Sequence, residues 1–225
     1  MIRMASETGL RPLPREPLSI DRVLRTAIRL ADERGLESLT MRKLAEALGV
    51  EAMSLYYYVA RKDDILDGIV DLVVKEMELA SEGADWKAAI RRSAISAHEV
   101  LERHPWACGL MMSPARVRPG RMRYIDSMLG RLREAGFSAD LTDRAYHALD
   151  SHIIGSTLWE VGYSFGSEGI EDFATAFVRN LSVDEYPYLT EHVGQHIAKP
   201  PVGETAFEFG LDLILEGLER ILVAG

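Results

Sequence analysis

Cysteine is almost absent from this chain of 225 residues, because Cys108 is the only one. A single cysteine cannot form an intrachain disulfide, which fits a reducing compartment, and we expect a cytoplasmic protein. A lone cysteine is most often a small buried hydrophobic residue. The sequence identifies no base that would activate its thiol, so neither a nucleophile nor a redox sensor is indicated.

Long apolar runs are missing as well. No stretch approaches the roughly 20 apolar residues of a membrane span, so we expect no membrane partner. Residues 1–17 hold Pro12, Pro14 and Pro17 but no apolar run, which predicts a flexible arm and not a signal peptide. Hydrophobic residues nevertheless make up 47% of the chain, which is enough to bury a core and excludes a disordered protein.

Recognisable catalytic and cofactor motifs are also lacking: a glycine-rich phosphate loop, G-x-S-x-G and C-x-x-C. His192 and His196 would share one helical face and could chelate a metal, but Val193 follows His192, so the zinc-protease pattern is absent. A solvated histidine pair explains them equally simply. We therefore predict no metal, no cofactor and no enzyme, while a catalytic pocket in the carboxy-terminal part remains an alternative.

The segment Leu39–Tyr58 predicts two short helices joined by a glycine turn. Thr40 suits the N-cap of the first helix, and Gly49 stands where that helix would end in a left-handed residue. The inward apolar positions are Leu44, Ala45, Leu48, Leu55 and Val59. Such a helix-turn-helix unit offers its second helix to the major groove of DNA.

Three consecutive tyrosines, Tyr56–Tyr58, support this interpretation. Successive helical residues point about 100° apart, so at least one tyrosine should be exposed and able to donate to phosphate or a base edge. The alternative, bulky core residues of an ordinary helical hairpin, suits Tyr56 better than the whole run. The residues predicted to contact DNA are Thr40, Arg42, Ala52, Met53, Ser54, Tyr56, Tyr57, Tyr58 and Lys62.

Charge is distributed unevenly along the chain. Residues 1–62 hold 11 Lys and Arg against 8 Asp and Glu, whereas residues 63–225 hold 15 against 27. Arg61 and Lys62 open a predicted helix over 62–79, where the helix dipole disfavours cations unless an anion such as phosphate lies outside the helix end. Two solvated surface cations are the alternative. Although the net charge of the whole chain is -9, the part that contains the helix-turn-helix unit carries an excess of cations.

The segment from about Ile20 to Leu66 resembles the DNA-binding domain of TetR-family transcriptional regulators. The resemblance rests on Thr40-x-Arg42-x-Leu44-Ala45-x-x-Leu48-Gly49-Val50, then Leu55-Tyr56, then Lys62-Asp63-Asp64-Ile65-Leu66. Val59 and Arg61 depart from the usual Phe and capping Ser or Asn. Asp85-Trp86-Lys87, residues 131–138 and the long helix that follows are similar to the tetracycline-repressor branch.

The complete pattern predicts an all-α fold. A three-helix helix-turn-helix DNA-binding domain (residues 18–64) is followed by a larger helical-bundle effector-binding and dimerisation domain (residues 65–225). Further helices are expected over 19–34, 86–103, 121–135, 138–164, 171–180, 191–198 and 204–223. No strand or repeat is indicated.

The resemblance implies an effector pocket in the second domain. Large or adaptable apolar side chains could line it, although several of them must belong to the plain core, and a histidine there is often a core residue. The candidates are His98, Trp106, Met111, Met112, Tyr124, Met128 and Trp159. In the tetracycline repressor a histidine helps to hold a magnesium–drug chelate, but the matching stretch Gly109–Ser113 has none, so no such site is expected.

Two helices carry stripes of small residues at heptad spacing. Ala148, Gly155 and Gly162 lie on the long helix, and Gly210 and Gly217 on the last one, which is apolar over more than half of its circumference. Pairing across a two-fold axis would bury both, although other helices of the same chain could also cover them. We therefore expect a homodimeric repressor that a small apolar effector releases from palindromic double-stranded operator DNA. The alternatives are an interaction scaffold or an enzyme with a vestigial DNA-binding unit.

Overall fold

The computed structural model describes residues 17–80, 85–113, 118–164, 183–197 and 205–224, and its regular elements in these ranges are all helical. The all-α prediction is confirmed. The elements are α1 (Ile20–Arg34), the 3-10 turn η1 (Leu36–Ser38), α2 (Met41–Leu48), α3 (Ala52–Leu55), α4 (Lys62–Val74), α5 (Trp86–Arg103), α6 (Trp106–Met111), α7 (Pro119–Glu134), α8 (Ala139–Ser164), α10 (Pro187–Ile197) and α11 (Ala206–Ala224). The predicted helix 171–180, and the predicted arm up to residue 16, lie outside the described residues.

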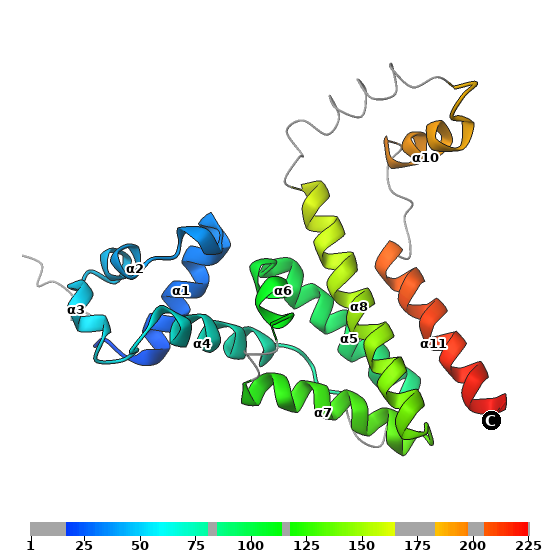
Figure 1. The fold of residues 1–225 in the computed structure, drawn as a ribbon, viewed down its shortest axis with the longest axis horizontal. Helices are drawn as coiled ribbons and strands as arrows, with labels where there is room; N and C mark the ends of the chain where they lie inside the picture. The colour runs from blue at the N-terminus through cyan, green and yellow to red at the C-terminus, as the bar shows by residue number, and fades with distance from the viewer. Residues whose placement is uncertain (1–16, 81–84, 114–117, 165–182, 198–204, 225) are drawn as a thin grey trace, which may run out of the picture.

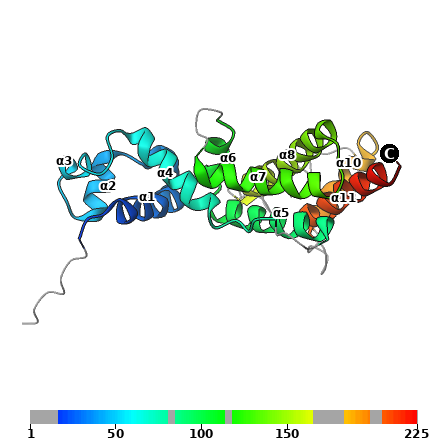
Figure 2. The same ribbon diagram turned by 90° about the horizontal axis from the view of Figure 1, so that it is seen from below.

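The molecule is elongated, with two helical groups joined by α4 (Figure 1). Helices α1, α2 and α3 pack at one end together with the start of α4, and α5, α7, α8 and α11 run side by side in the other group. Helix α6 lies between the two groups, against α4 (Figure 2). Movement of α4 would therefore displace residues in both groups.

Local capping signals set the ends of the first helices as predicted. The Ser19 hydroxyl accepts a hydrogen bond from the backbone N–H of Arg22 at 3.2 Å, and the Thr40 hydroxyl accepts one from the N–H of Lys43 at 3.2 Å. Gly49 has φ 69° and ψ 36°, the left-handed conformation that ends α2. The shared core of this unit consists of Val23, Ala27, Leu30, Leu39, Leu44, Ala45, Leu48, Leu55, Val59, Ile65, Leu66 and Ile69.

Helix α4 contributes to two cores. Its first half supplies Ile65, Leu66 and Ile69 to the amino-terminal core, and its second half supplies Val70 and Val73 to the larger core. The domain boundary that we placed after residue 64 therefore falls inside this helix. Packing is continuous across it.

Four details differ from the sequence-based expectation. Helix α10 begins at Pro187 and not near residue 191. Helix α3 ends at Leu55, because the N–H groups of both Tyr58 and Val59 bond to the single Leu55 carbonyl in a tight turn. Helix α4 ends at Val74 and not near residue 79, and the short helix α6 was not predicted. Elements of four to six residues carry too few apolar repeats for periodicity to identify them.

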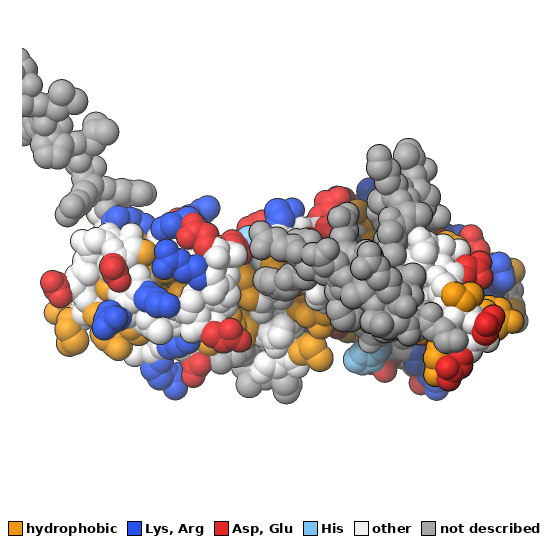
Figure 3. Space-filling view, turned by 90° about the horizontal axis from the view of Figure 1, so that it is seen from above, with side chains coloured by type: hydrophobic (Ala, Val, Ile, Leu, Met, Phe, Trp, Pro, Cys, Tyr) orange, Lys and Arg blue, Asp and Glu red, His pale blue; other side chains and the backbone are white. Residues whose placement is uncertain are grey.

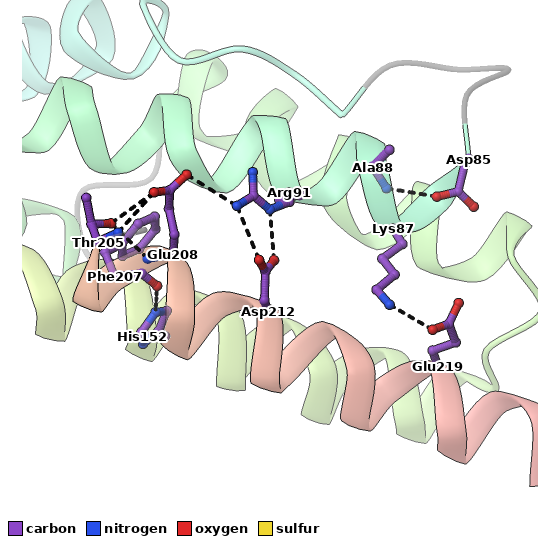
Figure 4. Close-up of polar contacts among 10 residues, drawn as sticks. All are labelled: Asp85, Lys87, Ala88, Arg91, His152, Thr205, Phe207, Glu208, Asp212 and Glu219. Carbon is purple, nitrogen blue, oxygen red and sulfur yellow. Dashed lines mark hydrogen bonds and ion pairs between the residues drawn. The ribbon is translucent and has the colours of Figure 1, made fainter. Parts of the chain in front are cut away.

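The last helix is held against α5 by charged side chains (Figure 4). The Arg91 guanidinium bonds to both carboxylate oxygens of Asp212, at 2.8 and 3.2 Å, and reaches Glu208 at 3.2 Å. One turn earlier on α5, Lys87 Nζ lies 2.7 Å from Glu219. These pairs fix the register of α11 on the bundle, while its buried face supplies the apolar contacts.

Across the described helices, none is both long and apolar enough to cross a membrane.

Candidate DNA-binding surface and effector region

The tyrosine turn after α3 is the most exposed aromatic feature of the amino-terminal unit. Tyr57 is 90% exposed, and Tyr56 and Tyr58 are also exposed. Met53, on α3 itself, is 74% exposed. We predicted that at least one tyrosine would be exposed, and the structure exposes all three because they lie in a turn and not along a helix. Large side chains in this position are available to a partner.

The remaining predicted DNA contacts surround this turn. Arg42 and Lys62 are exposed, whereas Ala52 and Ser54 are half-buried. The oxygen of Thr40 accepts the capping bond of α2, and its hydroxyl proton can still be donated to a phosphate. Lys and Arg side chains gather over this end of the molecule (Figure 3).

The start of α4 carries its own compensating anion. The Asp64 carboxylate accepts a hydrogen bond from the backbone N–H of Arg61 at 3.0 Å and lies 3.7 Å from its guanidinium. An external phosphate is therefore not needed to balance Arg61. Lys62 is exposed, and no ion pair from it is found within the described ranges, which leaves its ammonium for a partner.

Trp106, one of the predicted effector residues, lies where the two helical groups meet. Its indole N–H donates to Asp32 of α1 at 2.7 Å. His104 Nδ1 lies 2.8 Å from the same carboxylate oxygen and donates to it. Nearby, the backbone N–H of Gly120 at the start of α7 donates to Asp71 of α4 at 2.6 Å. These contacts join α1 and α4 to the larger domain.

Three of the predicted effector residues, Met111, Tyr124 and Met128, are buried together in the larger core. The Tyr124 hydroxyl is also buried, and its contact with the Ser93 side chain falls short of hydrogen-bond geometry. Burial raises the pKa of this phenol above its ordinary value. Met112, by contrast, is 65% exposed and contributes nothing to this interior.

Half-buried polar side chains that the sequence did not single out lie in the bundle. Burial raises the pKa of Asp150, against the opposing effects of the Arg121 charge and a hydrogen bond from Tyr146. Burial also raises the pKa of the Tyr146 phenol. No sequence motif marks these residues, because a single polar residue on a long helix looks the same whether it faces inward or outward.

An open pocket of about 360 Å³ lies between α8 and α11. Its lining residues are Ser151, His152, Gly155, Ser156, Trp159, Glu160, Ala206 and Phe207. Of the predicted effector residues, only Trp159 lines it. His98 lies behind it, with its ring stacked on Phe207 at a centroid distance of 3.8 Å. Burial raises the pKa of Glu160, which borders the pocket 3.0 Å from His98.

The small residues predicted for the dimer interface do not all lie on one free surface. Ala148, Gly155 and Gly162 are exposed on α8, and a Cβ added at Gly155, Gly162 or Gly217 would meet nothing within 4 Å. A Cβ at Gly210 would instead lie 2.5 Å from the His152 ring of the same chain. Gly210 therefore serves the packing of α11 on α8 within one chain.

A magnesium–drug chelate of the tetracycline-repressor kind does not fit here. Helix α6 and the residue after it supply Met111 and Met112, which are thioether side chains, where a histidine ligand would be needed.

Comparisons with known proteins agree with this architecture. Residues 23–69 match the family described as "Bacterial regulatory proteins, tetR family", and residues 79–222 match "Tetracyclin repressor-like, C-terminal domain". The HTH-type transcriptional repressor DrrR1 of Streptomyces coeruleorubidus is 32% identical over 97% of this chain and 84% of its own length. The class D tetracycline repressor protein of Escherichia coli is 28% identical, over 92% of each chain.

A solved structure shows the same fold. The TetR family protein ActR of Streptomyces coelicolor, in complex with (S)-DNPA, has a TM-score of 0.73 and 25% identity over 91% of this chain and 98% of its own. The chain belongs to the TetR family of transcriptional regulators. It is a ligand-responsive, DNA-binding transcriptional repressor and not an enzyme.

Proposed function

We propose that two copies of this chain bind a palindromic operator through the surface around Tyr57, and that a small, mostly apolar effector releases them. The observation that carries the proposal is the tyrosine turn, which exposes aromatic side chains beside Arg42 and Lys62 on a helix-turn-helix unit. An aromatic hydroxyl can read a base edge, and the cations can neutralise phosphates. A regulator that binds DNA in this way would act in the cytoplasm.

The homodimer would form through α8 and α11. Both helices expose large apolar side chains although each also has a buried face: Leu158, Trp159, Phe209, Leu213, Ile221 and Val223. Apolar residues at this density on neighbouring helices favour a four-helix contact between two chains. A two-fold dimer would present two reading units to two half-sites about 34 Å apart.

The effector would bind in the interior between α5, α7 and α8. The Tyr124 hydroxyl is buried there without a well-formed hydrogen bond, since its contact with Ser93 falls short of the usual geometry, and an acceptor on a bound molecule would satisfy it. Met111 and Met128, which lie in the same core, can adapt to different ligand shapes. The relative ActR has been solved with the small molecule (S)-DNPA.

Helix α4 would transmit the effector signal. It carries residues of both cores, and α6 and α7 both pack against it. A small tilt of α4 in each chain would spoil the spacing of the two reading units. The effector must prefer the tilted state, since equal affinity for both states shifts nothing. A coupling of about 1–3 kcal/mol would weaken operator binding about 5- to 150-fold, and operator would weaken effector binding equally.

The DNA contact can be tested with two single variants. Lys62→Ala should weaken binding to all duplexes similarly and reduce the salt slope by about one unit. Tyr57→Ala should weaken binding to operator more than to random DNA. Fluorescence anisotropy against labelled duplexes at several salt concentrations measures both effects.

Matched controls lie far from the proposed DNA surface. Tyr188 on α10 is 85% exposed, and Arg144 on α8 is an exposed cation, so Tyr188→Ala and Arg144→Ala should leave DNA affinity unchanged. If Tyr57→Ala and Lys62→Ala behave like these controls, the assigned surface is wrong.

A further inference from the structure

Three metal-ligating side chains converge beside the α8–α11 pocket. His98 and Glu102 lie four residues apart on one face of α5, and Glu160 reaches them from α8. One ligand atom from each residue lies within 4.8 Å of those of the other two. His98 Nε2 is already 3.0 Å from a Glu160 oxygen.

The hydrogen bonds of the His98 ring on the side away from the carboxylates determine which ring nitrogen is protonated. The Thr157 hydroxyl donates to the Ile153 carbonyl at 2.8 Å, so its proton is committed. His98 Nδ1 lies 3.0 Å from this same hydroxyl oxygen, which can only accept, so Nδ1 carries the proton. In the ion-free site Nε2–H can donate to Glu160 at 3.0 Å, whereas with a metal bound Nε2 would offer its lone pair, as in a metal-ligating histidine.

The position of the ring is fixed as well. His98 is 7% exposed, and its ring stacks on Phe207 with an interplanar angle of 9°. Glu102 is exposed at the surface and Glu160 borders the open pocket, so an ion could enter from solvent. A rigid nitrogen ligand beside two accessible oxygen ligands is a suitable arrangement for capturing a metal.

We propose that His98 Nε2 and the carboxylates of Glu102 and Glu160 bind one divalent first-row transition-metal ion of the zinc type. Imidazole favours such ions over Mg²⁺ or Ca²⁺, which prefer oxygen ligands alone. Zinc–ligand bonds of about 2.1 Å place tetrahedral donors about 3.4 Å apart. Rotation of the exposed Glu102 side chain can close the remaining gap. The fourth position faces the pocket and would hold water.

The ion would join α5 to α8 at the end of the bundle nearest the start of α11. The sequence alone predicted no metal site, because its ligands come from helices far apart along the chain and form no motif. Metal binding at this site can be tested without DNA and without the effector.

The experiment is calorimetric titration of Zn²⁺ into the untagged full-length protein after treatment with a chelator. One Zn²⁺ should bind per chain. At a free concentration about a hundred times Kd it should raise Tm by about 5–10 °C. Co²⁺ at the same site should give visible d–d absorption bands of a low-symmetry complex containing nitrogen and oxygen ligands.

Glu102→Gln and Glu160→Gln should each weaken Zn²⁺ binding at least about tenfold. Both replace a carboxylate that is exposed or borders solvent, so the fold should persist, and Tm without metal verifies this. His147 on α8 is an exposed histidine 3.6 Å from Asp143, and His147→Asn is the control that should bind Zn²⁺ as the wild type does.

The proposal is overturned if the wild type binds no stoichiometric Zn²⁺, or if both glutamine variants bind it unchanged. It is also overturned if His147→Asn abolishes binding, or if Mg²⁺ binds more tightly than Zn²⁺ in the same titration.

Discussion

The junction around Asp32 offers the sharpest test of how the two helical groups are joined. Its carboxylate accepts hydrogen bonds from His104 Nδ1 at 2.8 Å and from the Trp106 indole at 2.7 Å. His104 is buried, so Asp32→Ala leaves its N–H donor without an acceptor at a cost of about 1–3 kcal/mol. Trp106 is only half-buried, so water can replace Asp32 as the acceptor of its indole N–H, and the loss of this bond adds little to the cost.

For a chain of this length, 1 kcal/mol corresponds to about 2–4 °C in Tm, so Asp32→Ala should lower Tm by about 2–12 °C. Asp32→Asn retains one acceptor oxygen and should lose less. The control is Asp21→Ala on the same helix, which removes an exposed pair with Arg25 and should lower Tm much less. Scanning calorimetry of all three variants measures the differences. Equal Tm values for Asp32→Ala and Asp21→Ala would refute the assigned role of the junction.

Three further predictions concern other parts of the fold. Gly120→Ala should destabilise the fold by about 1–3 kcal/mol, since its Cβ would lie 2.7 Å from a carboxylate oxygen of α4. Gly130→Ala in the same helix meets nothing within 4 Å and should stabilise the fold by up to about 1 kcal/mol. Chemical denaturation compares the free energies of unfolding of the two variants. Asp150→Asn should raise Tm at neutral pH, because the raised pKa of Asp150 means that ionisation of this half-buried carboxyl costs stability. The gain should vanish as pH falls below the ordinary pKa of aspartate, and a gain that is the same at all pH values would contradict the prediction. Gly155→Trp and Gly217→Trp should each yield monomers in sedimentation experiments, since a Cβ at either position meets nothing within 4 Å in its own chain. Dimers that persist at low micromolar concentration in both variants would count against the proposed interface.

Local chemistry explains why much of the fold could be predicted. Ser19, Thr40 and Asp85 cap their helices through single hydrogen bonds to the third residue beyond them, and such a bond requires only neighbouring residues. Gly35 and Gly49 both adopt positive φ at helix ends, where a side chain would be strained. Signals that depend on adjacent residues can be read directly from sequence.

The effector region was harder to predict because it depends on which face of each helix turns inward. Met111 is buried and its neighbour Met112 is 65% exposed, although the two residue types are identical. Trp106 is drawn to the domain junction by Asp32, a partner that no motif reveals. Likewise, the small size of Gly210 makes room for the His152 ring of the same chain. Long-range contacts of this kind are set by tertiary packing.

The most direct test of the central claim is the DNA sequence that the protein selects. Repeated binding to a pool of random duplexes should enrich a palindrome whose half-sites lie about one helical turn apart. Sedimentation should then find two chains per selected duplex. Anisotropy at physiological salt should give an affinity at least about a thousandfold higher than for a scrambled duplex of equal length. Equal affinity for the selected and scrambled duplexes would contradict sequence-specific operator binding by this chain.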